Sequence, residues 1–445
     1  MAYLLGVLVI AVGVALSIAL HEIGHLAPAK RFGVKCTQYM VGFGPTLWST
    51  RRGETEYGLK AIPLGGYVRM IGMFPPAPGR AVRADSTGRW GLMIEQARHD
   101  SQREIGEEPP ERLFYTKPVW QRLIIMLGGP TMNLLIAVLL LAVIITGFGV
   151  PGLTTKLSTV SQCVLPASAP ADRQCTASDR LAPAAEAGLK PGDVVVAFDG
   201  RAVSSWDDVR DAIRAAGGRS ATITVDRAGE RLTVPVTPVL DDRPKLDGDG
   251  EPMVNADGEA VLERVGFLGV SPTTDLVPQP ITAVPGIVGI SLAKTAGVVL
   301  QIPQKMVGVA QAAFGDAKRD PNGPISIVGV GRFAGEVAAA DGDYASGGLS
   351  FKDRFAWLLT LVASLNLALF VFNLIPLLPL DGGHVAGALW EGLRRQIARA
   401  RRRPDPGPVD VARALPLAYG VASLLIGMSV LLIYADIVRP VRLGG

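Results

Sequence analysis

The chain has 445 residues, of which 49% are hydrophobic and only 19% are charged. Soluble proteins carry about 25% charged residues, so this composition excludes an ordinary soluble enzyme and indicates long apolar segments. The formal net charge of +4 does not indicate a nucleic-acid partner, because the basic residues cluster beside the apolar segments, where they usually set the orientation of a membrane protein.

Four apolar runs are long enough to cross a bilayer core of about 30 Å, which takes roughly 20 helical residues. They predict membrane spans at about 2–26, 123–150, 355–380 and 414–438. The first run lacks a basic start and a small-residue cleavage site, so we interpret it as a retained span. A fifth run, 284–314, is interrupted by Lys294, Gln301 and Pro303. It favours a helix on the outer membrane surface, with a fifth span as the alternative.

The end of the first run carries the motif H-E-x-x-H, formed by His21, Glu22 and His25. Residues four apart share one face of a helix, so the two imidazoles can bind one ion. Two imidazoles suit Zn²⁺, and a catalytic zinc keeps one position for water. Glu22 could then accept the proton of that water as a general base. The alternative is a pair of polar residues at the point where a helix leaves the bilayer.

A second motif, N-L-I-P-L-L-P-L-D-G-G-H, runs from Asn373 to His384 at the far end of another apolar run. A carboxylate at the edge of a span is costly and is therefore a functional candidate. Asp381 could supply the third zinc ligand, since residues 1–29 contain no further His, Cys, Asp or Glu beyond the first motif. His384 is not favoured as a ligand, because two histidines and a carboxylate suffice.

Together the two motifs resemble those of the site-2 protease family of intramembrane zinc metalloproteases, in its bacterial type with one PDZ-like domain. The resemblance extends over most of the chain and is weakest at about 74–112 and 241–262. Further matches are Gly129-Pro130-x-x-Asn133 and Pro63-Leu-Gly65-Gly66-Tyr67-Val68. It implies a zinc metalloendopeptidase that cuts single-span membrane proteins, such as anti-sigma factors, after an upstream site-1-type protease has removed their outer part.

The resemblance also places Asn373 in the active site, where its amide could stabilise an oxyanion. A hydrogen bond between spans is the alternative for Asn373, and also for Asn133. Residues 36–73 are rich in aromatic and β-branched residues broken by Gly and Pro, which predicts short strands and turns. The family implies that this region is a β-hairpin that holds the substrate as an added strand.

Residues 151–283 have the composition of a soluble domain. The segment from Ala184 to Gly200, with Pro-Gly-Asp and Asp-Gly turns around a β-branched strand, resembles a bacterial PDZ domain. In the family such a domain would select substrates by size or by their free end. Cys163 and Cys175 could form a disulfide in an oxidising compartment, and two free thiols are the equal alternative.

Six arginines between 394 and 403 mark a cytoplasmic loop. With four spans, this loop shares its side with 27–120, and the PDZ-like domain and both termini face outward from a bacterial inner membrane. Both metal motifs then end at the cytoplasmic side. A fifth span at 284–314 would instead separate Asp381 from His21.

The expected fold is a polytopic α-helical membrane protein of about four transmembrane helices, with a membrane-associated β-hairpin region and an inserted α+β PDZ-like domain. Its expected parts are a first transmembrane helix with H-E-x-x-H (1–27), a cytoplasmic region with the hairpin (28–119), a second transmembrane helix (120–150), the extracytoplasmic PDZ-like domain (151–283), a juxtamembrane amphipathic segment and loop (284–354), a third transmembrane helix with the Leu-Asp-Gly motif (355–384), a basic cytoplasmic loop (385–412) and a fourth transmembrane helix (413–438).

Two other functions are consistent with parts of this pattern. A membrane-anchored zinc protease could act on soluble chains, but that class usually takes its third ligand from a glutamate on a helix soon after H-E-x-x-H, and no such helix follows here. A non-catalytic PDZ membrane scaffold would have no use for Glu22 beside two histidines.

Overall fold

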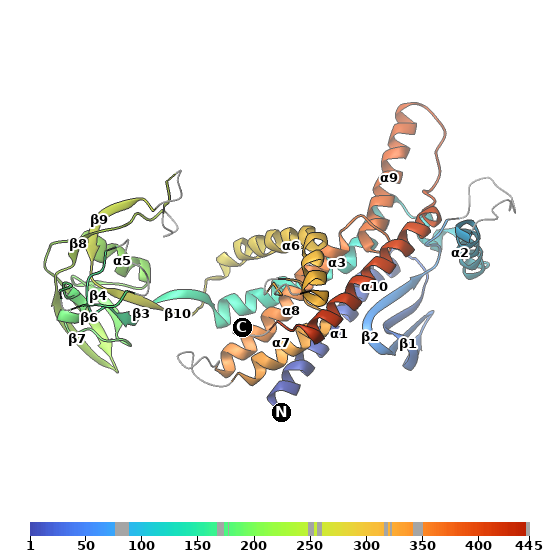
Figure 1. Cartoon of the computed structure of the whole chain (residues 1–445). Helices are drawn as coiled ribbons and strands as arrows, with labels where there is room; N and C mark the ends of the chain where they lie inside the picture. Colours follow the sequence, from blue (N-terminus) through green and yellow to red (C-terminus); the bar gives the residue numbers. More distant parts are fainter. Residues whose placement is uncertain are drawn as a thin grey trace. The chain divides into compact units, whose positions relative to one another are not determined.

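The computed structural model describes residues 1–75, 89–166, 173–176, 178–247, 253–255, 260–315, 319–320, 323–340 and 350–441. The chain forms two compact units, one from residues 1–148 together with 280–445, and the other from 149–279. The first unit consists mainly of helices and carries a β-hairpin, and the second is an α+β unit (Figure 1).

Among the described residues, five helices are long and apolar enough to cross a membrane. They are α1 (Ala2–Arg31), α3 (Val119–Val143, continued by a π-helical turn at Ile144–Phe148), α6 (Val284–Phe314), α8 (Phe351–Asn373) and α10 (Leu415–Val438). Four of them coincide with the predicted spans, and α6 is the run for which two interpretations were open.

The directions of the helices bear on how many of them cross. Asn366 Nδ2 of α8 donates to Ser17 Oγ of α1 over 2.8 Å, and Val362 packs on Gly13 one turn earlier in both helices. Contacts that advance together in both sequences show that α1 and α8 run parallel, so an odd number of crossings separates them. The antiparallel α3 supplies one crossing, which fits four spans with α6 on the surface. Figure 1 shows that α6 is bent rather than straight, and Pro303 lies inside it.

Three helices fall where other structure was expected. Helix α2 (Arg89–Ile105) lies within the cytoplasmic region of 28–119, where only a hairpin was expected, and α7 (Ile327–Ala339) lies within 284–354, expected as an amphipathic segment and a loop. The third span ends at Asn373 instead of continuing to 384, and the expected basic loop is largely a helix, α9 (Asp381–Ala400). The many charged residues of α2 and α9 suggest loops, but both segments are amphipathic helices. The small residues of α7 allow close packing against Gly6 of α1.

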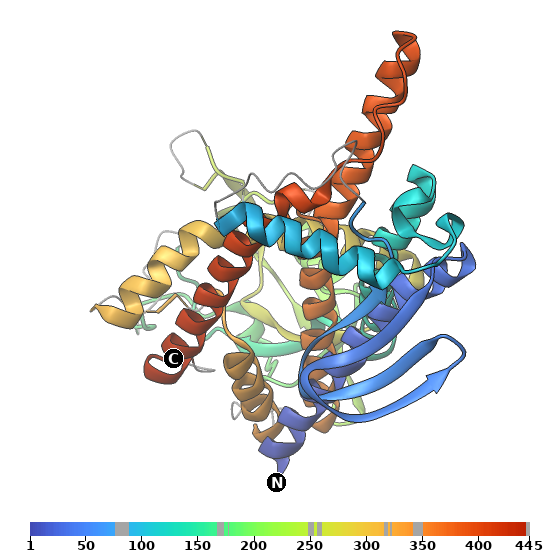
Figure 2. The ribbon, with the colours of Figure 1, turned by 90° about the vertical axis from the view of Figure 1, so that its right-hand side faces the viewer.

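The hairpin is formed by β1 (Cys36–Arg52) and β2 (Thr55–Met70). Tyr39 of β1 is paired with both Val68 and Tyr57, so the start of β1 lies between the two ends of the bent β2. Buried residues of β1 pack against the end of α1 and the start of α3, in a cluster that includes Leu26, Ala29, Cys36, Tyr39, Val41, Ile125 and Met126. Figure 2 shows the hairpin beside α1, where this packing fixes it next to the first metal motif.

The α+β unit has a sheet of strand order β10-β3-β4-β6-β7, with β5 beside β4 and a separate β8–β9 ribbon. Its strands are β3 (Val150–Val160), β4 (Val194–Phe198), β5 (Arg201–Ala202), β6 (Ala221–Arg227), β7 (Glu230–Val236), β8 (Val239–Pro244), β9 (Leu262–Phe267) and β10 (Val270–Val277), and its helices are α4 (Pro183–Glu186) and α5 (Trp206–Ala215). The amphipathic α5 begins at a capping box of Ser205 and Asp208 and buries Val209 and Ile213 in the core. The end of β8 and the start of β9 lie within 241–262, where the resemblance to the family is weakest.

A disulfide joins Cys163 and Cys175, and Cys36 is buried as a free thiol. Burial in the hydrophobic packing raises the pKa of Cys36 to about 12, so this thiol is unreactive at neutral pH. Of the two alternatives for Cys163 and Cys175, the structure has the disulfide.

Candidate metal centre

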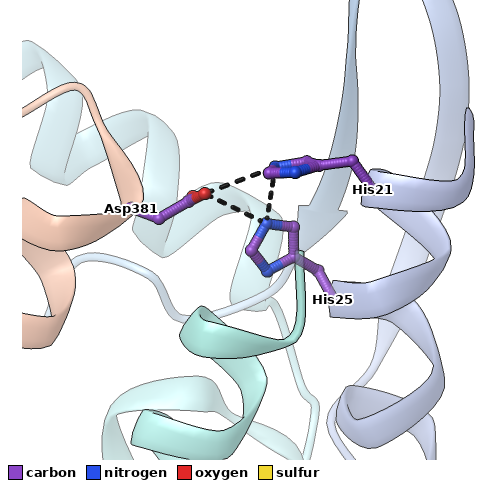
Figure 3. Close-up of side chains that lie close together, drawn as sticks. All are labelled: His21, His25 and Asp381. Atoms are coloured by element: carbon purple, nitrogen blue, oxygen red, sulfur yellow. Dashed lines mark hydrogen bonds and ion pairs between the residues drawn. The ribbon is translucent and has the colours of Figure 1, made fainter. Parts of the chain in front are cut away.

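Three side chains from the two motifs converge at one point (Figure 3). His21 Nε2 lies 3.2 Å from His25 Nε2, and Asp381 Oδ2 lies 3.3 Å from the first nitrogen and 3.4 Å from the second. Zinc bonds of about 2.0–2.2 Å in a tetrahedral arrangement separate neighbouring ligand atoms by about 3.3–3.5 Å. The triangle therefore has the size of three corners of a zinc site. Among the described residues, the buried Asp381 Oδ2 contacts the two imidazole nitrogens but accepts no hydrogen bond of regular geometry, as expected of an oxygen that serves a cation.

Close helix packing brings the two histidines to this point. A side chain at Gly24 of α1 would place its Cβ 2.3 Å from the carbonyl oxygen of Gly128 in α3, so only glycine permits the approach. Asp381 is the first residue of α9. A Cβ at the next residue, Gly382, would lie 2.3 Å from the carbonyl oxygen of Ile375, so this glycine lets the chain fold back after α8.

The ring nitrogens that face away from the site orient both imidazoles. His25 Nδ1 lies 2.8 Å from the carbonyl oxygen of Ile125, so this nitrogen carries the proton and Nε2 is free to bind a metal. His21 Nδ1 lies 3.1 Å from the amide nitrogen of Asn133, whose buried Oδ1 has no hydrogen-bond partner among the described residues. A metal on Nε2 requires a proton on Nδ1, which needs an acceptor. Exchanging the amide oxygen and nitrogen of Asn133 supplies that acceptor and satisfies Oδ1.

Comparison with known proteins identifies the family. Residues 9–404 match the model of peptidase family M50. The chain belongs to peptidase family M50. Zinc metalloprotease Rip1 of Mycobacterium tuberculosis is 35% identical over 447 residues that cover all of both chains. Rip1 of Mycolicibacterium smegmatis is 33% identical over 99% of this chain and 98% of the relative. Metalloprotease MmpA of Caulobacter vibrioides is 28% identical over 86% of this chain and 85% of the relative.

This M50 peptidase is therefore a zinc metalloprotease of the site-2 protease family, and its apolar helices make it a membrane protein. When bound, zinc polarises the carbonyl of the peptide bond and makes its water more acidic. The residues present fit that ion, since two imidazoles and a carboxylate are a common donor set for catalytic zinc.

Three further polar residues of the two motifs in this M50 peptidase are Glu22, Asn373 and His384. Glu22 is buried at 9% exposure, and a Cβ at Gly66 of the hairpin would lie 2.8 Å from its Cγ. Asn373 ends α8, and no hydrogen bond or ion pair between described residues joins it to the three converging side chains. His384 is not a member of the group of potential metal ligands.

Two features of the centre had little or no sequence signal. Asn133 matched a family motif, but nothing in the sequence assigned it to His21. The carbonyl of Ile125 that orients His25 belongs to the backbone and has no signature at all.

Proposed function

We propose that this peptidase hydrolyses peptide bonds in or near the membrane segments of single-span membrane proteins, with His21, His25 and Asp381 as zinc ligands. The supporting observation is that the three potential ligand atoms meet between the last third of α1 and the start of α9, which follows α8, among helices that are apolar along their length. His21 lies nineteen residues after the start of α1, or about 28 Å at 1.5 Å per residue. That distance is close to the thickness of a bilayer core, so the site belongs at a membrane edge.

Glu22 is the general base in this proposal. It accepts a proton from the attacking water and donates it to the leaving amine. Its buried position against Gly66 brings it next to the hairpin strand that would hold an extended substrate. A transmembrane helix hides its amide groups in its own hydrogen bonds, so a strand edge offers partners once the helix unwinds. Asn373 remains a candidate for stabilising the oxyanion.

The orientation follows from the arginines of 394–403, which would face the cytoplasm of a bacterial inner membrane together with the metal site. The α+β unit would then lie outside, where as a PDZ-like domain it would restrict access to substrates already trimmed by an upstream site-1-type protease. Anti-sigma-factor-like proteins are the substrate class that the family suggests.

A reconstituted cleavage assay tests the proposal. Glu22→Gln should retain zinc and lose cleavage of a single-span substrate in proteoliposomes, because the ligands remain and only the base is removed. Glu107→Gln, at an exposed position away from the site, is the matched control and should cleave like the wild type. Near-normal cleavage by Glu22→Gln would contradict the role of the base. Preferential cleavage of a soluble unfolded chain would favour the membrane-anchored soluble-chain protease instead.

A further inference from the structure

Helix α9, which begins with Asp381, has an exposed apolar stripe on one face. Leu389, Trp390, Leu393 and Ile397 are 54%, 55%, 46% and 41% exposed. Their spacing of one, four and eight residues keeps them on one face of the helix. Figures 1 and 2 show that α9 extends away from the other helices, at an angle to α8. No described residue covers this stripe, although the helix is held firmly by its opposite face.

The opposite face of α9 is locked to the protein through Glu391, which is 1% exposed. Its carboxylate accepts hydrogen bonds from the guanidinium of Arg122 in α3 and from the backbone N–H of Val409. Arg395 lies 3.0 Å from the same carboxylate. The free stripe is therefore held in a fixed orientation and is not the surface of a loosely attached helix.

Two arginines border the stripe on one side. At 100° per residue, Arg394 and Arg401 lie on the flank next to Trp390, whereas Arg399 lies about 80° beyond Leu389, toward the opposite face. Among the described residues, no ion pair engages any of these three, whereas Arg395 is paired with Glu391 and Asp405. Apolar residues with an aromatic ring, bordered by such cations, are the pattern of a helix that lies in the interface of an anionic membrane.

We propose that this stripe of α9 docks on the anionic lipid head groups and outer acyl region of the membrane leaflet next to the metal site. Leu389 lies about 12 Å and Ile397 about 24 Å along the helix from Asp381, so docking requires α9 to run along the membrane surface next to the site. A second copy of the chain fits poorly, since pairing two such faces would bring their arginines together. The proposal relies on the proposed placement of the site at the membrane edge.

Docking has a consequence for the metal centre, because Asp381 is the first residue of α9. A helix fixed by lipid at its stripe and by Glu391 at its opposite face cannot swing freely. Lipid docking would therefore add a second hold on the helix that carries Asp381, beside the one that Glu391 already provides.

Quenching of tryptophan fluorescence by brominated lipids tests the docking without relying on activity. The full chain is reconstituted in vesicles of phosphatidylcholine alone or of phosphatidylcholine with phosphatidylglycerol. The contribution of Trp390 is the quenching lost in Trp390→Phe. We expect it to be large with phosphatidylglycerol and small without it. The Trp390 contribution to quenching should fall to the neutral-lipid level in the triple variant Arg394→Gln, Arg399→Gln, Arg401→Gln, since each arginine contributes about fivefold to binding an anionic surface.

Trp120 is the matched control. It is 55% exposed at the start of a spanning helix, so its quenching should be equal in both lipids. Quenching of Trp120 without any from Trp390 would overturn the proposal, and so would disulfide cross-linking of Trp390→Cys between two copies. Either result combined with normal cleavage of a single-span substrate would leave the proposed protease function standing.

Discussion

Gly129 of α3 offers a sharp test of the metal centre, because it lies directly beside the two histidines. A Cβ added there would lie 2.2 Å from His25 Nε2 and 2.7 Å from His21 Nε2. An ordinary contact begins at 3.4 Å, so in Gly129→Ala the His25 ring must move by about 1.2 Å. Parting α1 from α3 by that distance would also break the hydrogen bond from His25 Nδ1 to the Ile125 carbonyl.

Metal sites tolerate errors of only about 0.2 Å in ligand distance. We therefore expect Gly129→Ala to lower zinc affinity by at least the 10–100-fold that loss of an orienting partner costs. Competition with a chromophoric zinc chelator measures the affinity, and thermal unfolding of the zinc-free protein checks the fold. Gly420→Ala in α10 is the matched control, since its Cβ would meet nothing within 4 Å. Wild-type zinc affinity in Gly129→Ala would refute the placement of the three ligands.

Three further predictions concern the surroundings of the site and the second unit. Asn133→Ala should lower zinc affinity about 10–100-fold in the same competition assay, and Asn133→Asp, which keeps an acceptor, should lose less. The hydrogen-bonded guanidinium of Arg227 holds the pKa of Asp193 below its usual value. The ion pair between Asp193 and Arg227 therefore stabilises the fold above about pH 4, and this stabilisation is lost as the pH falls through the folded-state pKa of Asp193. Asp193→Asn should cost about 1.5–3 kcal/mol at pH 7 and flatten the acid side of the stability profile, measured by denaturant unfolding. On intact cells an impermeant thiol reagent should label Glu230→Cys, whereas Arg403→Cys should react only after lysis, and the reverse pattern would contradict the orientation.

Two of the three proposed zinc ligands could be predicted from local spacing alone. His21 and His25 share a helix face by spacing alone, and residues 1–29 hold no other candidate ligand apart from Glu22 between them. Asp381 could be paired with them only through a family resemblance and a charge argument about topology, since nothing in the spacing of residues 360 positions away predicts a contact. The structure places all three ligand atoms within 4.8 Å of one another.

The amphipathic helices were harder to predict from the sequence. In α9 the arginines suggest a charged cytoplasmic loop, yet the segment is a helix. Its buried face centres on a charged residue, Glu391, which is paired with Arg122 from a distant part of the chain. In α7 the glycines and alanines that suggest a loop are the residues that let it approach α1, where Ala334 meets Gly6. Both helices are stabilised by partners far away in the chain, which no local pattern shows.

The most direct test of the zinc centre is the metal content of Asp381→Ala. Zinc is measured by elemental analysis of the purified protein after dialysis against a weak chelator, beside His384→Ala as a neighbouring control on the same helix. We predict one zinc per chain in the wild type and in His384→Ala, whereas Asp381→Ala should lose both zinc and the cleavage of a single-span substrate. A fully zinc-loaded and active Asp381→Ala protein would contradict it.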